Sequence, residues 1–220
     1  MQKKIIIFLG PPGSGKGTQA EMLAKKTDWK KISTGDLLRA EVAVGTKLGK
    51  LASKYQKQGK LVPDKLLISL VADSLKVKSR GFIFDGYPRN LKQLKDLLAM
   101  FKKIISQSDP VYAIEVAVGD REVKQRLSKR RVCGCGVVYH LKYNPPINNG
   151  VCDICGQKLF IRNDDKPKVI SHRLKIYHKQ GEPILAYWKK QGKLIEINGE
   201  QPIAKIHNDI LGKLRGLKLI

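Results

Sequence analysis

A glycine-rich stretch with one lysine, GPPGSGKGTQ (10–19), follows the apolar run IIIFL (5–9) and precedes a helix-like segment. Glycines let the backbone turn so that successive N–H groups point inward, and the start of a helix adds the positive end of its dipole. Lys16 supplies a mobile positive charge beside these groups. Because Gly10, Gly15 and Lys16 have the spacing of a phosphate-binding loop, we expect this stretch to bind a phosphate.

The residue after this lysine departs from the phosphate-loop pattern. Gly17 stands where Ser or Thr is expected, and the hydroxyl comes one position later, at Thr18. Direct ligation of Mg²⁺ by that hydroxyl is therefore in doubt. A turn that binds no ligand is the alternative, but a strand, a loop and a helix occur here in the order that phosphate binding requires.

The composition indicates a globular protein with a strong positive charge. The 220 residues include 43 Lys and Arg against 19 Asp and Glu, which gives a net charge of +24, and 42% of the residues are hydrophobic. Nucleotide phosphates, RNA and DNA are candidate partners, and a generally lysine-rich surface is the interpretation that we favour for most lysines. No apolar run is long enough to cross a bilayer and no signal-peptide pattern follows Met1, so we expect a cytoplasmic protein without membrane partners.

Apolar strand-like runs alternate with helical stretches along the chain. The strands are expected at 5–9, 81–88, 111–118 and 194–199, and the helices at 17–26, 64–76, 91–104, 121–130, 169–191 and 202–216. Strands that are apolar throughout and alternate with helices indicate an α/β protein whose parallel sheet is covered on both faces. Such sheets bind ligands at the carboxyl ends of their strands, which places the glycine-rich loop and the turn FDGYPR at the same edge.

Several motifs occur in the order seen in adenylate kinases, and they span the chain nearly end to end. They are GPPGSGKGTQA, ISTGDLLRAEVAVGTKLGK, GKLVPD, GFIFDGYPRNLKQ, RLSKRRVC and RNDD. The chain most resembles the bacterial long-lid form of this family, which carries a cysteine cluster in its lid. The resemblance implies the P-loop nucleoside-monophosphate kinase fold and reversible phosphoryl transfer in which MgATP and AMP give two ADP.

The resemblance also implies a division into a core and two inserted segments. The core would consist of residues 1–33, 64–128 and 166–220. Residues 34–63, punctuated by glycines, would form an AMP-binding flap, and residues 129–165 a lid. These two segments are the places where the alternation of strands and helices is interrupted.

Phosphoryl transfer needs in-line placement of the reacting groups and neutralisation of charge on the phosphate oxygens. No general base is required, because an AMP phosphate oxygen is already an anionic nucleophile. Arginine suits this task, since its planar fork holds two oxygens at once. By resemblance the catalytic cations are Lys16, Arg89, Arg130, Arg162 and Arg173.

The resemblance assigns binding residues to each nucleotide. For ATP these are Gly13, Ser14, Gly15, Lys16, Gly17, Thr18, Arg126, Arg130 and Gln201. For AMP they are Thr34, Gly35, Arg39, Val62, Gly86, Arg89, Gln93, Arg162 and Arg173. Arg126 would pack on the ATP adenine, whereas Arg131 is left open between a functional role and a solvated helix arginine.

Two polar residues carry further expectations. Asp85 closes an apolar strand, where an unpaired carboxylate is costly unless a cation meets it, and Mg²⁺ held through water is the natural partner. Asp36 is either a helix N-cap or a metal contact. Gln93 lies four residues after Arg89, so the two would share a helix face, and its amide can both donate to and accept from an adenine edge.

The cysteines are confined to the expected lid, a clustering that favours metal over disulfides in a cytosolic chain. They are Cys133, Cys135, Cys152 and Cys155. The second pair is a CxxC knuckle, whereas the first is one residue shorter and needs a turn, which Gly134 and Gly136 permit. We expect a structural Zn²⁺ that stabilises the lid, with no metal as the alternative, and His140 is either a substitute ligand or a histidine of the lid surface.

Other functions remain open from the sequence. Within the same class, the alternatives are a UMP or CMP acceptor or a GTP donor. From another class, the charge and the cysteines suggest a basic zinc-ribbon protein that binds nucleic acid, with a steep salt dependence. Aromatic residues are only 6% of the chain, so base-stacking platforms are scarce and we expect nucleic acid to bind only nonspecifically. We also expect a monomer.

Overall fold

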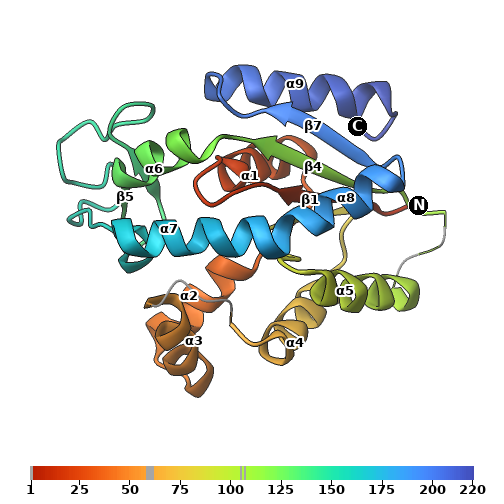
Figure 1. Cartoon of the computed structure of the whole chain (residues 1–220), viewed down its shortest axis with the longest axis horizontal. Coiled ribbons are helices and arrows are strands. Elements are labelled where there is room, and N and C mark those ends of the chain that lie inside the picture. The colour runs from red at the N-terminus through yellow and green to blue at the C-terminus, as the bar shows by residue number, and fades with distance from the viewer. Residues whose placement is uncertain (1, 58–61, 105, 107) are drawn as a thin grey trace.

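The structure, a computed structural model, describes residues 2–57, 62–104, 106 and 108–220. Its core is a five-stranded parallel sheet in the order β2-β3-β1-β4-β7 (Figure 1). The strands are β1 (Lys4–Leu9), β2 (Lys30–Ser33), β3 (Gly81–Asp85), β4 (Val111–Ala117) and β7 (Leu194–Asn198). This sheet, with helices around it, confirms the fold class that the alternating pattern predicts.

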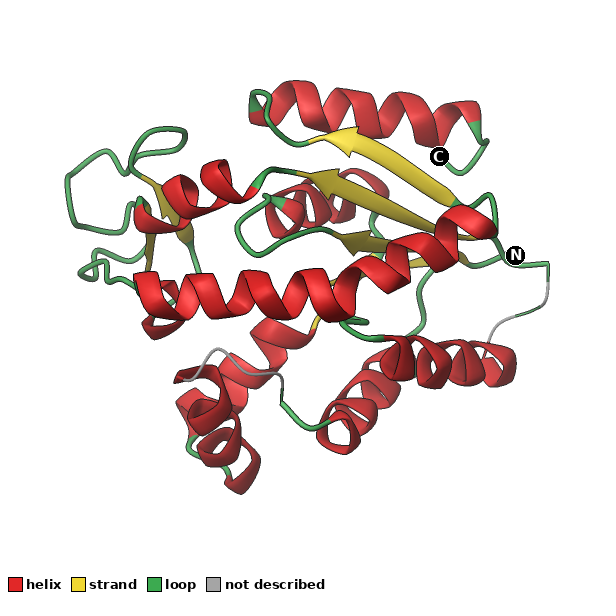
Figure 2. Ribbon diagram, viewed as in Figure 1, coloured by secondary structure: helices red, strands yellow, loops and turns green. Residues whose placement is uncertain are grey.

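Successive residues of β1 point to opposite faces of the sheet, and both faces are buried. Ile5 and Ile7 pack on one side, against α2 (Thr34–Val44), α3 (Lys47–Lys57), α4 (Asp64–Leu75), α5 (Leu91–Ile104) and α8 (Glu182–Lys190). Ile6 and Phe8 pack on the other side, against α1 (Lys16–Thr27) and α9 (Ile203–Gly216). Figure 2 shows the strands between these helices. Burial on both faces explains why the strand is apolar at every position.

The sheet differs from the expectation at two places. β2 is absent from the expected strands, because its four residues begin with two lysines and form an edge of the sheet, where polar side chains remain solvated. β3 ends at Asp85 rather than at residue 88, since Gly86 takes a φ of +71° and turns the chain out of the sheet.

The helical stretch expected at 169–191 is nearly continuous. α7 (Pro167–Ile176) runs through the π-helical turn η2 (Tyr177–Gly181) into α8. Figure 1 shows these elements in line across the molecule, beside the sheet. They follow the segment 129–165 and lead the chain back to β7.

The two inserted segments lie beside the carboxyl edge of the sheet. Residues 34–57 form α2 and α3, while residues 58–61 of the expected flap, including Gly59, lie outside the described residues. Of the glycines expected to interrupt this segment, Gly45 does so, because it ends α2 with a φ of +76°. Gly49 does not, because it lies within α3. The segment 129–165 contains the antiparallel pair β5 (Arg130–Val132) and β6 (Val138–His140), and it follows α6 (Asp120–Ser128).

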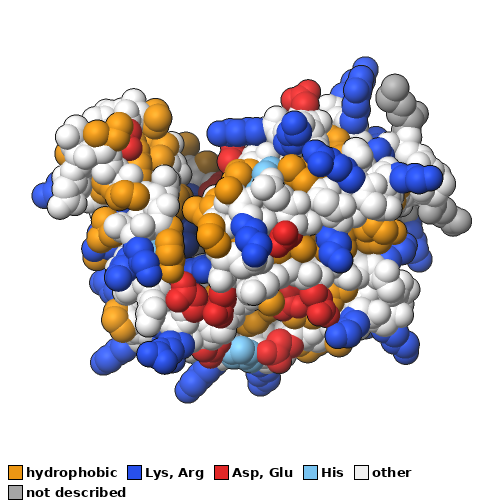
Figure 3. Space-filling model, turned by 90° about the horizontal axis from the view of Figure 1, so that it is seen from above, with side chains coloured by type: hydrophobic (Ala, Val, Ile, Leu, Met, Phe, Trp, Pro, Cys, Tyr) orange, Lys and Arg blue, Asp and Glu red, His pale blue; other side chains and the backbone are white. Residues whose placement is uncertain are grey.

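Positive charge is distributed over the surface. Figure 3 shows Lys and Arg side chains spread along a whole face of the molecule, with acidic side chains among them. This distribution supports the interpretation of most lysines as surface residues. Across the described residues, no helix combines the length and the apolar character needed to cross a membrane.

Substitution of Gly49 tests the close approach of α2 and α3. A Cβ at Gly49 would lie 2.0 Å from the carbonyl oxygen of Glu41, so we expect Gly49→Ala to lower the free energy of unfolding by about 1–3 kcal/mol. Gly212→Ala on α9 is the matched control, because nothing lies within 4 Å of its added carbon, and it should stabilise by up to about 1 kcal/mol. Chemical denaturation measures both effects. Equal effects would contradict the close approach.

Candidate active site

The glycine-rich loop joins the carboxyl end of β1 to the first turn of α1. Gly10 has a φ of +137°, and a side chain there would place its Cβ 2.6 Å from the carbonyl oxygen of Val116. Glycine meets both constraints without strain. α1 begins at Lys16 with Gly15 as N-cap and without a side-chain cap, so the N–H groups of its first turn remain available to an anion.

Gly17 stands where the phosphate-loop pattern has Ser or Thr, and the structure gives a steric reason for the glycine. A Cβ at this position would lie 2.9 Å from Oδ2 of Asp85, the last residue of β3. A serine or threonine would therefore press against the carboxylate. Asp85 is half-buried and makes no hydrogen bond or ion pair with the residues that the structure describes, so its oxygens are free for a cation. Thr18 follows on α1 with an exposed side chain.

Lys16 is half-buried within this loop. Its Nζ donates a hydrogen bond to the carbonyl oxygen of Pro11 at 3.0 Å. Burial lowers the pKa of Lys16 to about 8, against the attraction of Asp85 and with the added repulsion of Arg89 and Arg173. An incoming phosphate would raise this pKa again, because it would supply the negative charge that the lysine lacks.

Two lid-side arginines share one buried carboxylate. Asp165 belongs to the 3₁₀ turn η1 (Asn163–Asp165), and its side chain is fully buried. Arg130 on β5 donates from Nε at 2.8 Å and from Nη2 at 2.6 Å to the two oxygens of Asp165. Arg173 on α7 donates to Asp165 Oδ1 at 3.3 Å and lies 3.0 Å from Asp164 Oδ2. These pairs hold both guanidinium groups in place.

The lid-side arginines lie near Arg39 and Arg89. Burial lowers the pKa of Arg162 to about 10, with repulsion from Arg130 and Arg39. Loss of hydration likewise lowers the pKa of Arg89 to about 10, with repulsion from Arg173. All of these groups remain cationic at neutral pH. These groups therefore form one region of concentrated positive charge, which suits an anion.

Arg39 is held on α2 by an ion pair with Asp36. The N-cap of α2 is Ser33, whose Oγ accepts the N–H of Asp36 at 3.3 Å, so of the two alternatives for Asp36 the helix cap is wrong. Although burial works in the opposite direction, the Arg39 guanidinium holds the pKa of Asp36 below its usual range. A Cβ on Gly35 would lie 3.1 Å from Arg39 Nη1, so this glycine leaves room for the arginine.

The other residues expected at the AMP site lie together around the turn after β3. Thr34 Oγ1 donates to the carbonyl oxygen of Gly86 at 3.3 Å, and Arg89 Nε donates to the same oxygen at 2.6 Å. Val62 is buried in the core beside the flap. The turn thus links the start of α2 to Arg89.

Gln93 contacts Arg89, but not by sharing a helix face with it. α5 begins at Leu91, so Arg89 precedes the helix and the expected face-sharing is wrong. Gln93 Oε1 accepts the backbone N–H of Arg89 at 2.7 Å, and Gln93 Nε2 donates to Asp64 Oδ1 at 2.7 Å. Asn90 Oδ1 in turn accepts the N–H of Gln93 at 2.8 Å. Asn90 thus caps the start of α5, while Gln93 binds the N–H of the residue before that cap.

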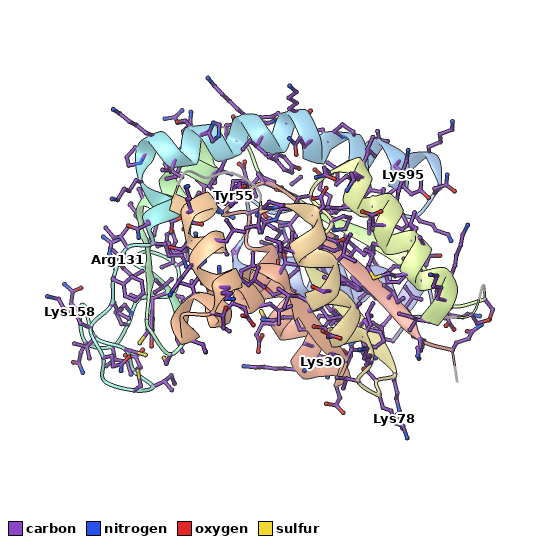
Figure 4. All side chains as sticks on the ribbon, turned by 90° about the horizontal axis from the view of Figure 1, so that it is seen from below. Lys30, Tyr55, Lys78, Lys95, Arg131 and Lys158 are labelled. Carbon is purple, nitrogen blue, oxygen red and sulfur yellow. The ribbon has the colours of Figure 1, made fainter. Side chains whose placement is uncertain are left out.

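Arg126 on α6 lies between the glycine-rich loop and the turn after β7. It donates to Ser14 O at 3.3 Å and to Gly199 O at 2.9 Å. Gln201 Nε2 binds the backbone of the same turn at 2.9 Å. Arg131 instead donates to nearby backbone carbonyls of the lid base, which favours the solvated role for this arginine (Figure 4).

The lid cysteines lie together. Their sulfur atoms are all within 4.8 Å of one another, with 3.3 Å between Cys133 and Cys155 and 3.6 Å between Cys135 and Cys152. Tetrahedral Zn²⁺ with Zn–S bonds of about 2.3 Å separates its sulfurs by about 3.8 Å, so the cluster fits this metal. The short pair is closed by Gly136, which has a φ of +95° and donates its N–H to Cys133 O at 3.0 Å. The turn that the CxC spacing requires is thus present.

His140 is not part of the cysteine cluster. Its Nδ1 accepts the backbone N–H groups of Lys142 and Tyr143, both at 3.1 Å, and its ring stacks on that of Tyr143 at 4.5 Å. The sequence leaves His140 open between a substitute metal ligand and a histidine of the lid surface, and this geometry supports the second alternative.

Three carboxylates of the site were not expected from the sequence. Asp164 and Asp165 hold the lid-side arginines, and Asp64 holds Gln93. The adjacent acids of RNDD, which follow Arg162 after one asparagine, were a signal for the first two. Asp64 carries no such signal, because its partner lies 29 residues away in the sequence.

Comparisons with known proteins agree over nearly the whole chain. The family model described as adenylate kinase matches residues 8–193. An adenylate kinase of Methanothrix thermoacetophila is 46% identical over 207 residues, which cover 93% of this chain and 95% of that protein. Adenylate kinases of Methanosarcina barkeri and Archaeoglobus fulgidus are each 43% identical and cover 96% and 97% of this chain, and 98% and 99% of their own lengths.

The lowered pKa of Lys16 makes nucleotide binding depend on pH. The lysine is protonated in the free protein only below about pH 8, and a bound phosphate holds it protonated to higher pH. We therefore expect the affinity for ATP to fall as the pH rises through 8 to about 9, with proton uptake on binding. Calorimetry in buffers of different ionisation enthalpy measures this uptake. Lys16→Met is the control: if it kept the same uptake, another group would be responsible.

Proposed function

The chain belongs to the adenylate kinase family, and we propose that its glycine-rich loop and convergent arginines carry out the reversible transfer of a phosphoryl group from MgATP to AMP. The observation that carries the proposal is the meeting of Lys16, Arg39, Arg89 and the lid-side arginines at the carboxyl edge of the sheet. The products are two molecules of ADP. This activity balances the adenine nucleotides.

Each cationic side chain of the site would bind a particular phosphate group. Lys16 and the N–H groups of α1 suit the terminal phosphates of ATP, because they lie at the loop. Arg39 and Arg89, at the flap and the turn after β3, suit the phosphate of AMP. Arg130 and Arg173 suit the group in transit, since their planar forks neutralise charge that spreads over its oxygens.

The acidic partners would keep the arginines ready for substrate. Asp165 orients Arg130 and Arg173 without a nucleotide, so little reorganisation is needed when phosphate oxygens arrive. Arg39, held by Asp36, is positioned in the same way. The protein thus supplies placement and charge, and AMP supplies its own nucleophile.

Asp85 fits the requirement for Mg²⁺. Its carboxylate stands at the end of β3, close to Gly17, and binds no other described residue. Oxygen ligands and retained waters are what Mg²⁺ prefers, and the ion would neutralise charge on the ATP phosphates. Asp85 would hold it through water, beside the loop.

The acceptor and donor bases follow from the same assignment. Gln93 would read the AMP base near Thr34 and Val62, and Arg126 would pack on the ATP adenine near Gln201. The relatives described above are named adenylate kinase, so they give no support to a UMP or CMP acceptor or to a GTP donor.

The lid would carry a structural Zn²⁺. Cys133 and Cys152 are buried with Tyr139 and Leu159 in a small cluster of their own, too small a core to order this segment without help. The Tyr139 hydroxyl, 3.5 Å from Sγ of Cys152, lowers the pKa of that thiol and favours the thiolate that binds metal. A fully ligated Zn²⁺ leaves no position for substrate, so its role would be stability.

The remaining expectations stay predictions. They are a cytoplasmic location, a monomeric state, the division into core, flap and lid, and the absence of specific nucleic-acid binding. On the face that Figure 3 shows, acidic side chains lie among the lysines and arginines, which supports the last of these predictions, because a nucleic-acid site is typically a continuous basic patch.

ADP formation across a panel of nucleoside monophosphates and triphosphates tests the function. We expect ATP with AMP to be the best pair, and Lys16→Met to lower its turnover by at least about a thousandfold while the fold is kept, since a buried phosphate charge loses its main countercharge. Lys25→Met is the matched control, because this lysine of α1 is 77% exposed. Near wild-type turnover of Lys16→Met would remove the loop from the donor site.

Removal of the metal tests the lid. We expect about one Zn²⁺ per chain, and a strong chelator should lower the melting temperature markedly while activity at low temperature survives in large part. Elemental analysis and melting curves before and after chelation measure this, and reloading with Zn²⁺ is the control. Loss of activity with unchanged stability would overturn the structural role.

A further inference from the structure

The amide of Gln93 is fully buried, and it has a hydrogen-bond donor on one side and a hydrogen-bond acceptor on the other. Oε1 accepts the backbone N–H of Arg89, and Nε2 donates to the carboxylate of Asp64, both at 2.7 Å. A backbone N–H can only donate and an ionised carboxylate can only accept. The amide therefore has one allowed orientation, because a flip would replace both hydrogen bonds by repulsive contacts.

Asp64 is built to remain the acceptor. It begins α4, its side chain is 19% exposed, and Lys92 Nζ lies 3.3 Å from Oδ2, the oxygen that Gln93 does not use. Although burial works against ionisation, the hydrogen bonds from Gln93 and Lys92 hold the pKa of Asp64 below its usual range. The carboxylate is thus ionised at neutral pH.

The fixed orientation leaves Gln93 with a defined pattern for a ligand. Among the described residues each amide atom has one partner, so one N–H of Nε2 and one lone pair of Oε1 are unused. A donor beside an acceptor matches the ring nitrogen and amino group of adenine. It mismatches the N–H and carbonyl of hypoxanthine, which would require the amide to flip. The base reaches the buried amide only when side chains over it move.

We propose that Asp64 is a positioning residue that locks the Gln93 amide and thereby selects acceptor bases with an amino edge over those with a keto edge. The inference rests on the proposed function, in which Gln93 reads the AMP base. Asp64 itself does not touch the substrate. Its effect passes through one hydrogen bond, which connects the start of α4 to the start of α5.

Asp64→Asn tests this with little change of shape. The asparagine can turn its own amide and so bond to Gln93 in either orientation, which removes part of the penalty for the flip. We expect the preference for AMP over IMP, measured as the IMP inhibition constant divided by the KM for AMP, to fall about tenfold, the value of one hydrogen bond. kcat with AMP should stay within about threefold of the wild type.

Two further variants separate positioning from a structural role. Lys92→Ala removes the partner of the other carboxylate oxygen of Asp64 and should leave the preference unchanged. In a Gln93→Leu background, Asp64→Asn should no longer alter the preference, because the effect acts through the glutamine. An unchanged preference in Asp64→Asn, or the same change with and without Gln93, would overturn the proposal.

ADP formation by the wild-type protein separates a failure of this proposal from a failure of the proposed function. A wild type that makes no ADP from ATP and AMP would refute the proposed function. A wild type that makes ADP, with a preference that does not respond to Asp64→Asn, would refute the locking of Gln93 alone. Melting curves of each variant establish that the compared proteins are folded.

Discussion

The architecture of the site depends on positive charge held together at one edge of the sheet. Like charges at this distance repel, and burial of Lys16 and Arg162 makes the repulsion stronger because less water screens it. The fold resists it with acidic partners, above all the buried Asp165, which binds two arginines at once. Bound phosphate groups would neutralise more of this positive charge than the acidic side chains do. Relief of the repulsion between the cations would therefore contribute to the free energy of substrate binding.

The parallel sheet makes this concentration of charge feasible. Parallel strands end at the same edge, so the loop after β1 and the turn after β3 meet there, although they are about 70 residues apart in the sequence. The two inserted segments add their arginines from outside, and α3 contacts the turn η1 that carries Asp165. Figure 4 shows the lid, with Arg131 and Lys158, beside the helix that carries Tyr55. The sheet therefore positions the glycine-rich loop and the turn after β3, and the two inserted segments add arginines around them.

The sequence predicts those features whose cause is local. The loop, the apolar strands and the position of Asp85 follow from spacing and periodicity, and the helix 91–104 agrees with α5 at both ends. Features caused by distant contacts are different. The crowding of Gly17 by Asp85 and the bond between Gln93 and Asp64 depend on strands and helices that meet only in the folded chain. β2 was missed because an edge strand of four residues has too weak a pattern to be distinguished from a loop.

The position of Asp165 has a consequence for the evolution of the lid. Its two arginine partners come from either side of the lid insertion, Arg130 at its entry and Arg173 beyond its exit, so the base of the insertion is closed by one carboxylate. The cysteines lie farther out, in a small cluster separate from this base. The outer part of the segment 129–165 is thus separate from the carboxylate that closes its base, so a change in the length or folding of that outer part would leave the pairs of Arg130 and Arg173 in place.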